Sequence, residues 1–213
     1  MENTLHAQEE LAYIRKVITE SRATFVEDGK PYIFWGIIIA IGMTLTYISV
    51  LTQTELYVGY VWIGLTLLGW GTIIYYARDK KKRAVRTRSF IDRIQGAIWG
   101  ACGAAIGLSV FLIILGDNLK ATGVPPIHQY YICFVTSIIV GIAYLLSGIA
   151  NDLKWLGYIG YAWWAGAVVM IVVPSVHNLL LYALMLIFFQ VVPGIILLKR
   201  YKRITAGYSV EAP

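Results

Sequence analysis

The residues best placed to do chemistry in this hydrophobic chain form a short polar break near its C-terminal end. Gln190 stands in the middle of the apolar run 179–198, and Pro193 and Gly194 follow it within one helical turn. Proline has no N–H, so in an α-helix the carbonyl of Phe189 would lose its usual donor. A free carbonyl beside an amide could bind a neutral solute. The break could equally be a kink, with Gln190 bonded to a neighbouring helix.

Hydroxyl and aromatic side chains in other apolar runs could share a pocket with this break. The predicted ligand-binding residues are Gln190, Pro193, Tyr144, Tyr161, Trp164, Ser109 and Thr44. Each hydroxyl could instead bond to the backbone of its own helix, and the aromatic rings could simply pack against other helices. The sequence leaves both interpretations open.

Motifs of soluble catalytic sites are missing from the sequence. It has no HExxH for zinc, no GxSxG turn for a nucleophile and no glycine loop with the lysine that would hold a phosphate. The three histidines, His6, His128 and His177, are isolated from one another. We therefore expect no catalytic residues, no metal site and no cofactor.

The elements that carry these side chains are apolar runs long enough to cross a membrane. Of the 213 residues, 58% are hydrophobic and 14% are charged, whereas soluble domains have about 45–50% and about 25%. A transmembrane helix requires roughly 20 mostly apolar residues. Six runs meet this length: 32–51, 57–77, 94–115, 130–150, 155–173 and 179–198. The predicted fold is all-α, a polytopic membrane bundle of six helices.

The distribution of charge predicts the orientation of this bundle. All but one of the 18 lysines and arginines lie before residue 32, in 78–93, in 151–154 or after residue 198; the exception is Lys120. Lysine and arginine favour cytoplasmic loops. Both termini are therefore predicted to be cytoplasmic, in the cell (inner) membrane. The net charge of +6 then reflects topology and attraction to anionic lipid headgroups, and no nucleic acid partner is expected.

Three regions follow from these boundaries: an amphipathic helix and hinge over 1–31, the transmembrane domain over 32–198, and a basic tail over 199–213. The helix carries an apolar stripe formed by Leu11, Ile14, Ile18 and Phe25. This stripe could pack on the protein's own surface or on the membrane, or it could bind a partner protein or a second copy of the chain. The predicted lipid-headgroup residues are in the polybasic loop: Lys80, Lys81, Lys82, Arg83, Arg86 and Arg88.

Small residues predict where the helices pack, because helices in lipid associate through close contact at such residues. Gly96, Gly100 and Ala104 recur every four residues in the run 94–115, which we therefore expect to be the most buried helix. The pairs Gly36 with Ala40 and Ser137 with Gly141 offer similar contact faces in their own runs.

Two functions remain open from the sequence. The first is a non-enzymatic regulatory, sensory or assembly role carried by the N-terminal helix, favoured because no charged residue lies inside a run. The alternative is a small transporter or channel for a neutral or lipophilic solute, with a pocket around Gln190. The order of a short cytoplasmic helix and paired spans is similar to that of bacterial membrane proteins. The sequence lacks the marks of rhomboid proteases, mitochondrial carriers and PQ-loop transporters.

Overall fold

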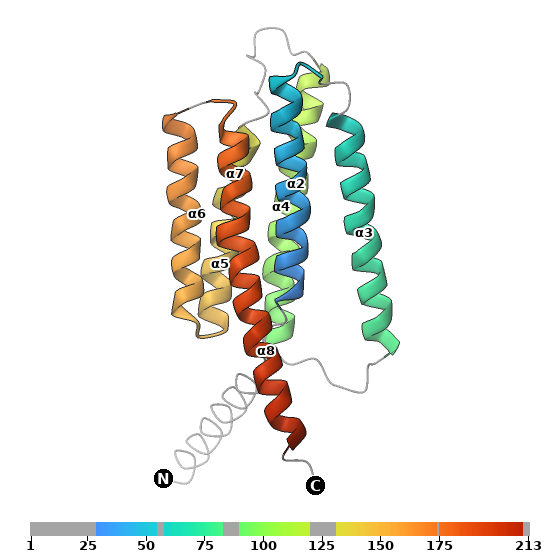
Figure 1. The fold of residues 1–213 in the computed structure, drawn as a ribbon, viewed down its shortest axis with the longest axis vertical. Helices are drawn as coiled ribbons and strands as arrows, with labels where there is room; N and C mark the ends of the chain where they lie inside the picture. Colours follow the sequence, from blue (N-terminus) through green and yellow to red (C-terminus); the bar gives the residue numbers. More distant parts are fainter. Residues whose placement is uncertain (1–28, 55–57, 83–89, 120–130, 174, 211–213) are drawn as a thin grey trace, which may run out of the picture.

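The computed structural model describes residues 29–54, 58–82, 90–119, 131–173 and 175–210, and every regular element in these ranges is helical. The helices are α2 (Lys30–Leu51), α3 (Val58–Lys82), α4 (Phe90–Leu119), α5 (Tyr131–Ala150), α6 (Lys154–Val172), α7 (Asn178–Leu186), the π-helical turn η2 (Ile187–Val191) and α8 (Val192–Val210). The last three run on as one long helix, and all lie roughly side by side in a bundle (Figure 1). The all-α prediction is confirmed.

Five helical segments are long and apolar enough to cross a membrane: Lys30–Leu51, Arg93–Leu112, Ile132–Ala150, Lys154–Val172 and Asn178–Arg203. They correspond to five of the six predicted runs and are compatible with a multi-pass membrane protein. The remaining run, 57–77, lies in the continuous helix α3, in which the described side chains form a shorter apolar stretch, Val58–Gly69. The count of six spans stays a prediction.

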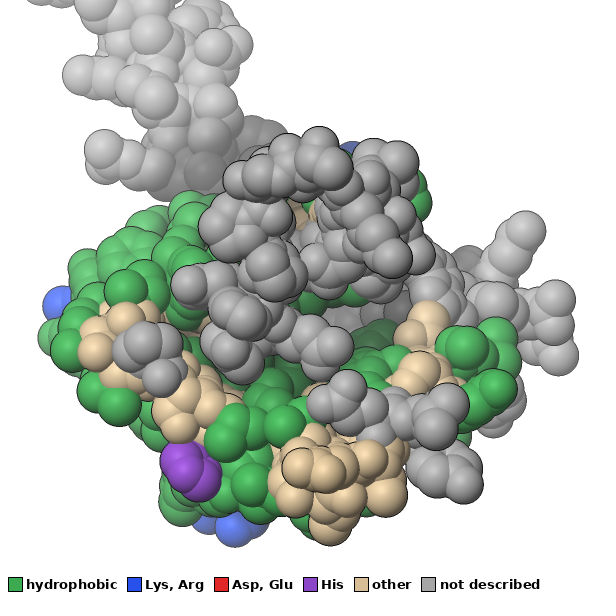
Figure 2. Space-filling model, turned by 90° about the horizontal axis from the view of Figure 1, so that it is seen from above, with side chains coloured by type: hydrophobic (Ala, Val, Ile, Leu, Met, Phe, Trp, Pro, Cys, Tyr) green, Lys and Arg blue, Asp and Glu red, His purple; other side chains and the backbone are tan. Residues whose placement is uncertain are grey.

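The two ends of the bundle differ in charge. At the end where α2 begins and α8 projects, here called the basic end, the exposed cationic side chains are Lys30, Arg93, Lys154, Lys199, Arg200, Lys202 and Arg203. Asp152 is the exposed acid described at this end. At the opposite end, seen from above in Figure 2, hydrophobic and uncharged polar side chains predominate among the residues described.

Helices α5 and α6 form a tight hairpin because glycines let their backbones meet. A Cβ added at Gly148 would lie 2.7 Å from the backbone nitrogen of Gly157, and one added at Gly160 would lie 2.6 Å from the carbonyl oxygen of Gly141. Both distances are too short for a real side chain. The predicted contact face at Gly141 is confirmed, and its neighbour Ser137 is fully buried.

Helix α2 packs on the final long helix by the same means. A Cβ at Gly36 would lie 2.7 Å from Cγ2 of Val191, and a Cβ at Gly29 would lie 2.8 Å from the backbone nitrogen of Leu198 and collide with the carbonyl of Gly194. The predicted contact face at Gly36 is confirmed. The start of α2 therefore crosses α8 with the two backbones in contact.

The prediction that the third apolar run is the most buried is wrong. Only 6% of the apolar window of α4 is buried, against 50% for that of α5. A Cβ added at Gly96, Gly100, Gly103 or Gly107 would have no atom within 4 Å among the residues described. Helix α4 instead turns the face that carries Ile91, Gln95 and Cys102 inward.

Helix α3 lies at the edge of the bundle and packs on α2 (Figure 1). The indole Nε1 of Trp62 donates a hydrogen bond to Oγ1 of Thr46 at 3.1 Å. Gly42 of α2 accommodates the side chains of Trp62 and Leu65, since a Cβ there would lie 2.7 Å from Cδ1 of Leu65. The core thus consists of α2, α5, α6 and the final long helix, with α3 and α4 on its flanks.

Candidate functional site

A buried polar network joins α2, α4 and α5 near the basic end. The side chain of Gln95 on α4 is 6% exposed. Its Nε2 donates to the hydroxyl of Tyr32 at 3.1 Å and to Oγ of Ser147 at 2.8 Å. Asn151 donates from Nδ2 to Oε1 of Gln95 at 3.3 Å and to the carbonyl oxygen of Ser147 at 2.8 Å. Neutral groups therefore tie three helices together without burying a charge.

Three aromatic rings pack against this network. The ring centroids of Tyr32 and Trp99 lie 5.1 Å apart, those of Trp99 and Tyr144 lie 5.5 Å apart, and those of Tyr32 and Tyr144 lie 5.7 Å apart. Two of the three pairs meet edge to face, the favourable geometry for aromatic rings. Tyr32 belongs to both the network and the ring cluster, so it connects the start of α2 to α4 and α5.

A second aromatic cluster lies between α6 and the final long helix. Trp163 is fully buried, and its ring centroid lies 5.7 Å from that of Tyr182 and 6.2 Å from that of Phe189. Its Nε1 has no hydrogen-bond partner among the residues described. Nearby, Nδ2 of Asn178 donates to the carbonyl oxygen of Met170 at 2.9 Å and holds the two helices together. The surroundings of Trp163 are those of a packed aromatic core.

Gln190 lies in the π-helical turn η2 and is 6% exposed. Its side chain packs on α2, since a Cβ added at Gly36 would lie 3.3 Å from Cγ of Gln190. The π turn also shifts the hydrogen bonds, because the N–H of Val192 bonds to the carbonyl of Ile187, five residues earlier. The expectation that Pro193 frees the carbonyl of Phe189 assumed α-helical pairing throughout this stretch, and the structure has a π turn immediately before the proline.

The structure does not gather the predicted ligand-binding residues into one pocket. Tyr144 is in the ring cluster described above, while Tyr161 is 56% exposed on the outside of α6. Trp164 donates from Nε1 to the carbonyl oxygen of Ile138 at 3.1 Å and so closes the α5–α6 hairpin. Ser109 and Thr44 each donate at 2.8 Å to the carbonyl four residues earlier in their own helix. Only Gln190, Pro193 and Tyr144 belong to the interior.

Other predicted residues lie outside what the structure describes. They are the partner-binding stripe of Leu11, Ile14, Ile18 and Phe25, the lipid-headgroup residues Arg83, Arg86 and Arg88, and the side chains of Lys80, Lys81 and Lys82. The proposed roles of these residues stay predictions.

The Gln95 network is the part of the interior that sequence reasoning missed. Gln95 stands second in the predicted run 94–115, so it looked like a residue at the end of a span, whereas Gln190 lies in the middle of its run. A spacing signal was available: Gln95 and Trp99 are four residues apart on one helix, and Ser147 and Asn151 are four apart on another. Such pairs share a helix face.

Comparison of the chain with known protein families, with curated proteins and with solved structures finds no match. Function must therefore be inferred from the residues and their geometry. Amides and hydroxyls in the Gln95 network can hold helices together or accept and donate hydrogen bonds. Among the residues described, no three His, Cys, Asp or Glu side chains form a group that could hold a metal ion.

Proposed function

We propose that the protein is a non-enzymatic, six-span protein of the cell membrane with a regulatory, sensory or assembly role. In this proposal both termini are cytoplasmic, and the bundle holds the N-terminal helix at the membrane surface, where its apolar stripe binds a protein partner. The 78–93 loop contributes attraction to anionic lipid headgroups.

The observation that carries the proposal is the way α2 is fixed where the N-terminal segment joins it. Tyr32 accepts a hydrogen bond from Gln95 on α4, and its ring contacts Trp99 and Tyr144. Three residues earlier, the backbone of Gly29 contacts Gly194 on α8. Packing and neutral hydrogen bonds thus concentrate at this attachment point, as expected of a scaffold that presents a segment.

The difference in charge between the two ends supports the orientation. The exposed lysines and arginines gather at the basic end, where α2 begins and where α8 continues past the apolar part of the final helix. Cationic residues are enriched on the cytoplasmic side of membrane proteins. This distribution supports the proposal that both termini are on the cytoplasmic side.

The environment of Gln190 weighs against the transporter alternative. A solute site would need this amide to face a polar cavity, whereas its side chain lies against Gly36 and is 6% exposed. Of the other predicted pocket residues, Tyr161 is exposed on the outside of α6, and Ser109 and Thr44 bond to the backbone of their own helices. The packing around Gln190 instead supports contact between α2 and the final long helix.

The test is capture of the partner from native membranes. Leu11→Asp with Ile18→Asp places two charges on the stripe, and Ala12→Asp with Thr19→Asp places the same two charges about 100° away on the helix. The full-length protein and both variants are purified in a mild detergent, and bound proteins and small molecules are identified by mass spectrometry. We expect a stoichiometric protein that the stripe variant loses and the control retains.

Two results would count against the proposal. One is a partner that the stripe variant retains in full. The other is the absence of any partner together with a bound metabolite that is lost on Gln190→Leu, which would favour the transporter. Thermal unfolding in detergent checks that both variants keep a folded bundle.

A further inference from the structure

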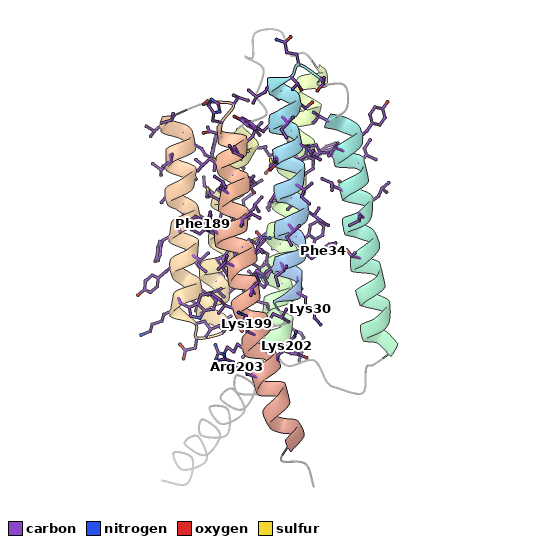
Figure 3. All side chains as sticks on the ribbon, in the orientation of Figure 1. Lys30, Phe34, Phe189, Lys199, Lys202 and Arg203 are labelled. Atoms are coloured by element: carbon purple, nitrogen blue, oxygen red, sulfur yellow. The ribbon has the colours of Figure 1, made fainter. Side chains whose placement is uncertain are left out.

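Four cationic side chains gather where α2 crosses α8. Lys199, Lys202 and Arg203 are spaced three and four residues apart, so they share one face of α8, and all three are exposed. Lys30 is exposed at the start of α2. It comes close to this face in the fold, because the preceding Gly29 packs on the backbone of Leu198. Figure 3 shows the four labelled side chains together at the basic end.

The two helices that supply these cations contain no carboxylate. Neither Lys30–Leu51 nor Val192–Val210 includes an Asp or a Glu. The acids nearest in sequence, Glu27 and Asp28, lie outside the residues described. Within the residues described, the α2–α8 crossing brings together cations from two separate helices.

Apolar surface continues directly from these cations. On α2, Lys30 stands in line with Ile37 and Ile41, which are 41% and 48% exposed. On the final long helix, Ile195 and Ile196 lie four and three residues before Lys199 and are 38% and 48% exposed. Two exposed apolar stripes, one on each helix, thus end in cations at the same level of the bundle.

We propose that this crossing is a binding site for an anionic phospholipid of the leaflet at the basic end. The phosphate lies on the α8 face of Lys199, Lys202 and Arg203, beside the start of α2, and the acyl chains follow the apolar stripes of α2 and the final helix. Arginine can bind phosphate through two parallel hydrogen bonds, and lysine supplies point charges. The site rests on the membrane location in the proposed function, but it does not require the N-terminal helix to have a partner.

The apolar stripes favour a lipid over a free phosphate as the ligand. A soluble anion would use the cations alone and would leave the isoleucines without a role. A phospholipid satisfies both parts of the surface at once, since its phosphate sits at the depth where an apolar helix face gives way to charged residues. Bound there, it would also hold the start of α2 against α8.

Native mass spectrometry of the full-length protein in detergent tests the site. The protein is titrated with phosphatidylglycerol or with phosphatidylcholine of the same acyl chains. Lys199→Gln with Lys202→Gln removes two charges from the site, and Arg93→Gln with Lys154→Gln removes two exposed charges elsewhere at the same end. We expect the first pair to weaken phosphatidylglycerol binding about tenfold and the second pair to weaken it less than about twofold.

Three outcomes would overturn the site. Equal losses in the two double variants would mean general attraction to a basic surface. Equal affinity of the unchanged protein for the two lipids would mean that the cations do not select the headgroup. Displacement of the lipid by millimolar inorganic phosphate would mean a site for free anions. None of these affects the partner-capture result, so failure of the lipid site is distinguishable from failure of the proposed function.

Discussion

Replacing Gln95 with leucine tests whether the buried amide network holds α4 in place. Gln95 donates two hydrogen bonds and accepts one, at distances of 2.8 to 3.3 Å. Hydrogen bonds between helices in a membrane contribute about 0.6 kcal/mol on average and at most about 1.7 kcal/mol. Leucine has similar bulk but bonds to none of these partners. We expect the free energy of unfolding to fall by about 1–2 kcal/mol.

The assay is reversible unfolding in bicelles, with a double-mutant cycle to isolate one contact. Gln95→Leu and Ser147→Ala are measured singly and together, and a coupling energy of about 0.6–1.7 kcal/mol is expected between them. Ser109→Ala is the matched control on the same helix. Its hydroxyl bonds to its own backbone, so the change should stay below about 0.5 kcal/mol.

The reasoning is refuted if Gln95→Leu costs no more than Ser109→Ala and the cycle shows no coupling. In that case the network would not form in the membrane, and another force would have to orient α4. A cost without coupling to Ser147 would locate the stabilisation in the bonds to Tyr32 or Asn151, which Tyr32→Phe and Asn151→Ala test by the same cycle.

Two further predictions concern the glycines and Gln190. Gly148→Val should destabilise the α5–α6 hairpin by about 1–3 kcal/mol in the same unfolding assay, because its Cβ would lie 2.7 Å from the nitrogen of Gly157. In the control Gly107→Val, the added Cβ has no atom within 4 Å among the residues described, so the free energy of unfolding should change little. Equal effects of the two substitutions would contradict the packing. Gln190→Leu should keep partner capture intact, because the side chain serves packing on Gly36; loss of a bound solute, followed by mass spectrometry, would contradict this.

The positions of the helices were largely predictable from the sequence, because length and hydropathy alone decide which runs can cross a membrane. The predicted helix ends differ most from the observed ends at the basic end of the bundle. Helix α4 begins at Phe90, four residues before its predicted run, and α8 continues to Val210, twelve residues past its predicted run. Lysine and arginine are good helix formers, and their long side chains reach water from an extended helix. Hydropathy therefore marks where the apolar part ends but not where the helix ends.

The orientation of α4 could not be predicted from its glycines. Gly96 and Gly100 offer a smooth contact face, but that face is open in the residues described. A different face carries Gln95, whose amide would be costly to leave without hydrogen-bond partners in lipid. Turning Gln95 toward Ser147 and Tyr32 satisfies that amide. One buried polar residue with available partners thus outweighs a row of small residues that has no neighbour to contact.

The chemistry predicted for the break at Gln190 depended on α-helical hydrogen bonding through Pro193. The sequence contains the polar residue and the proline, but it did not indicate the π turn η2 that stands just before Pro193. Prolines and π turns are both common points of irregularity in helices. Here Gly36 of α2 packs against this point and leaves room for the side chains of Gln190 and Val191.

Three contacts join the interior to the start of α2, from which the proposed partner-binding segment extends. Gln95 fixes the hydroxyl of Tyr32, Gly29 fixes the backbone of α2 against Gly194, and Gly36 fixes α2 against the π turn. All three lie within the first two turns of α2 or just before it, where the N-terminal segment joins the bundle. The first two turns of α2 are therefore fixed to α4 and to the final long helix. Under the proposed function, a change in the membrane that shifts α4 or α8 would move the start of α2, to which the N-terminal segment is joined.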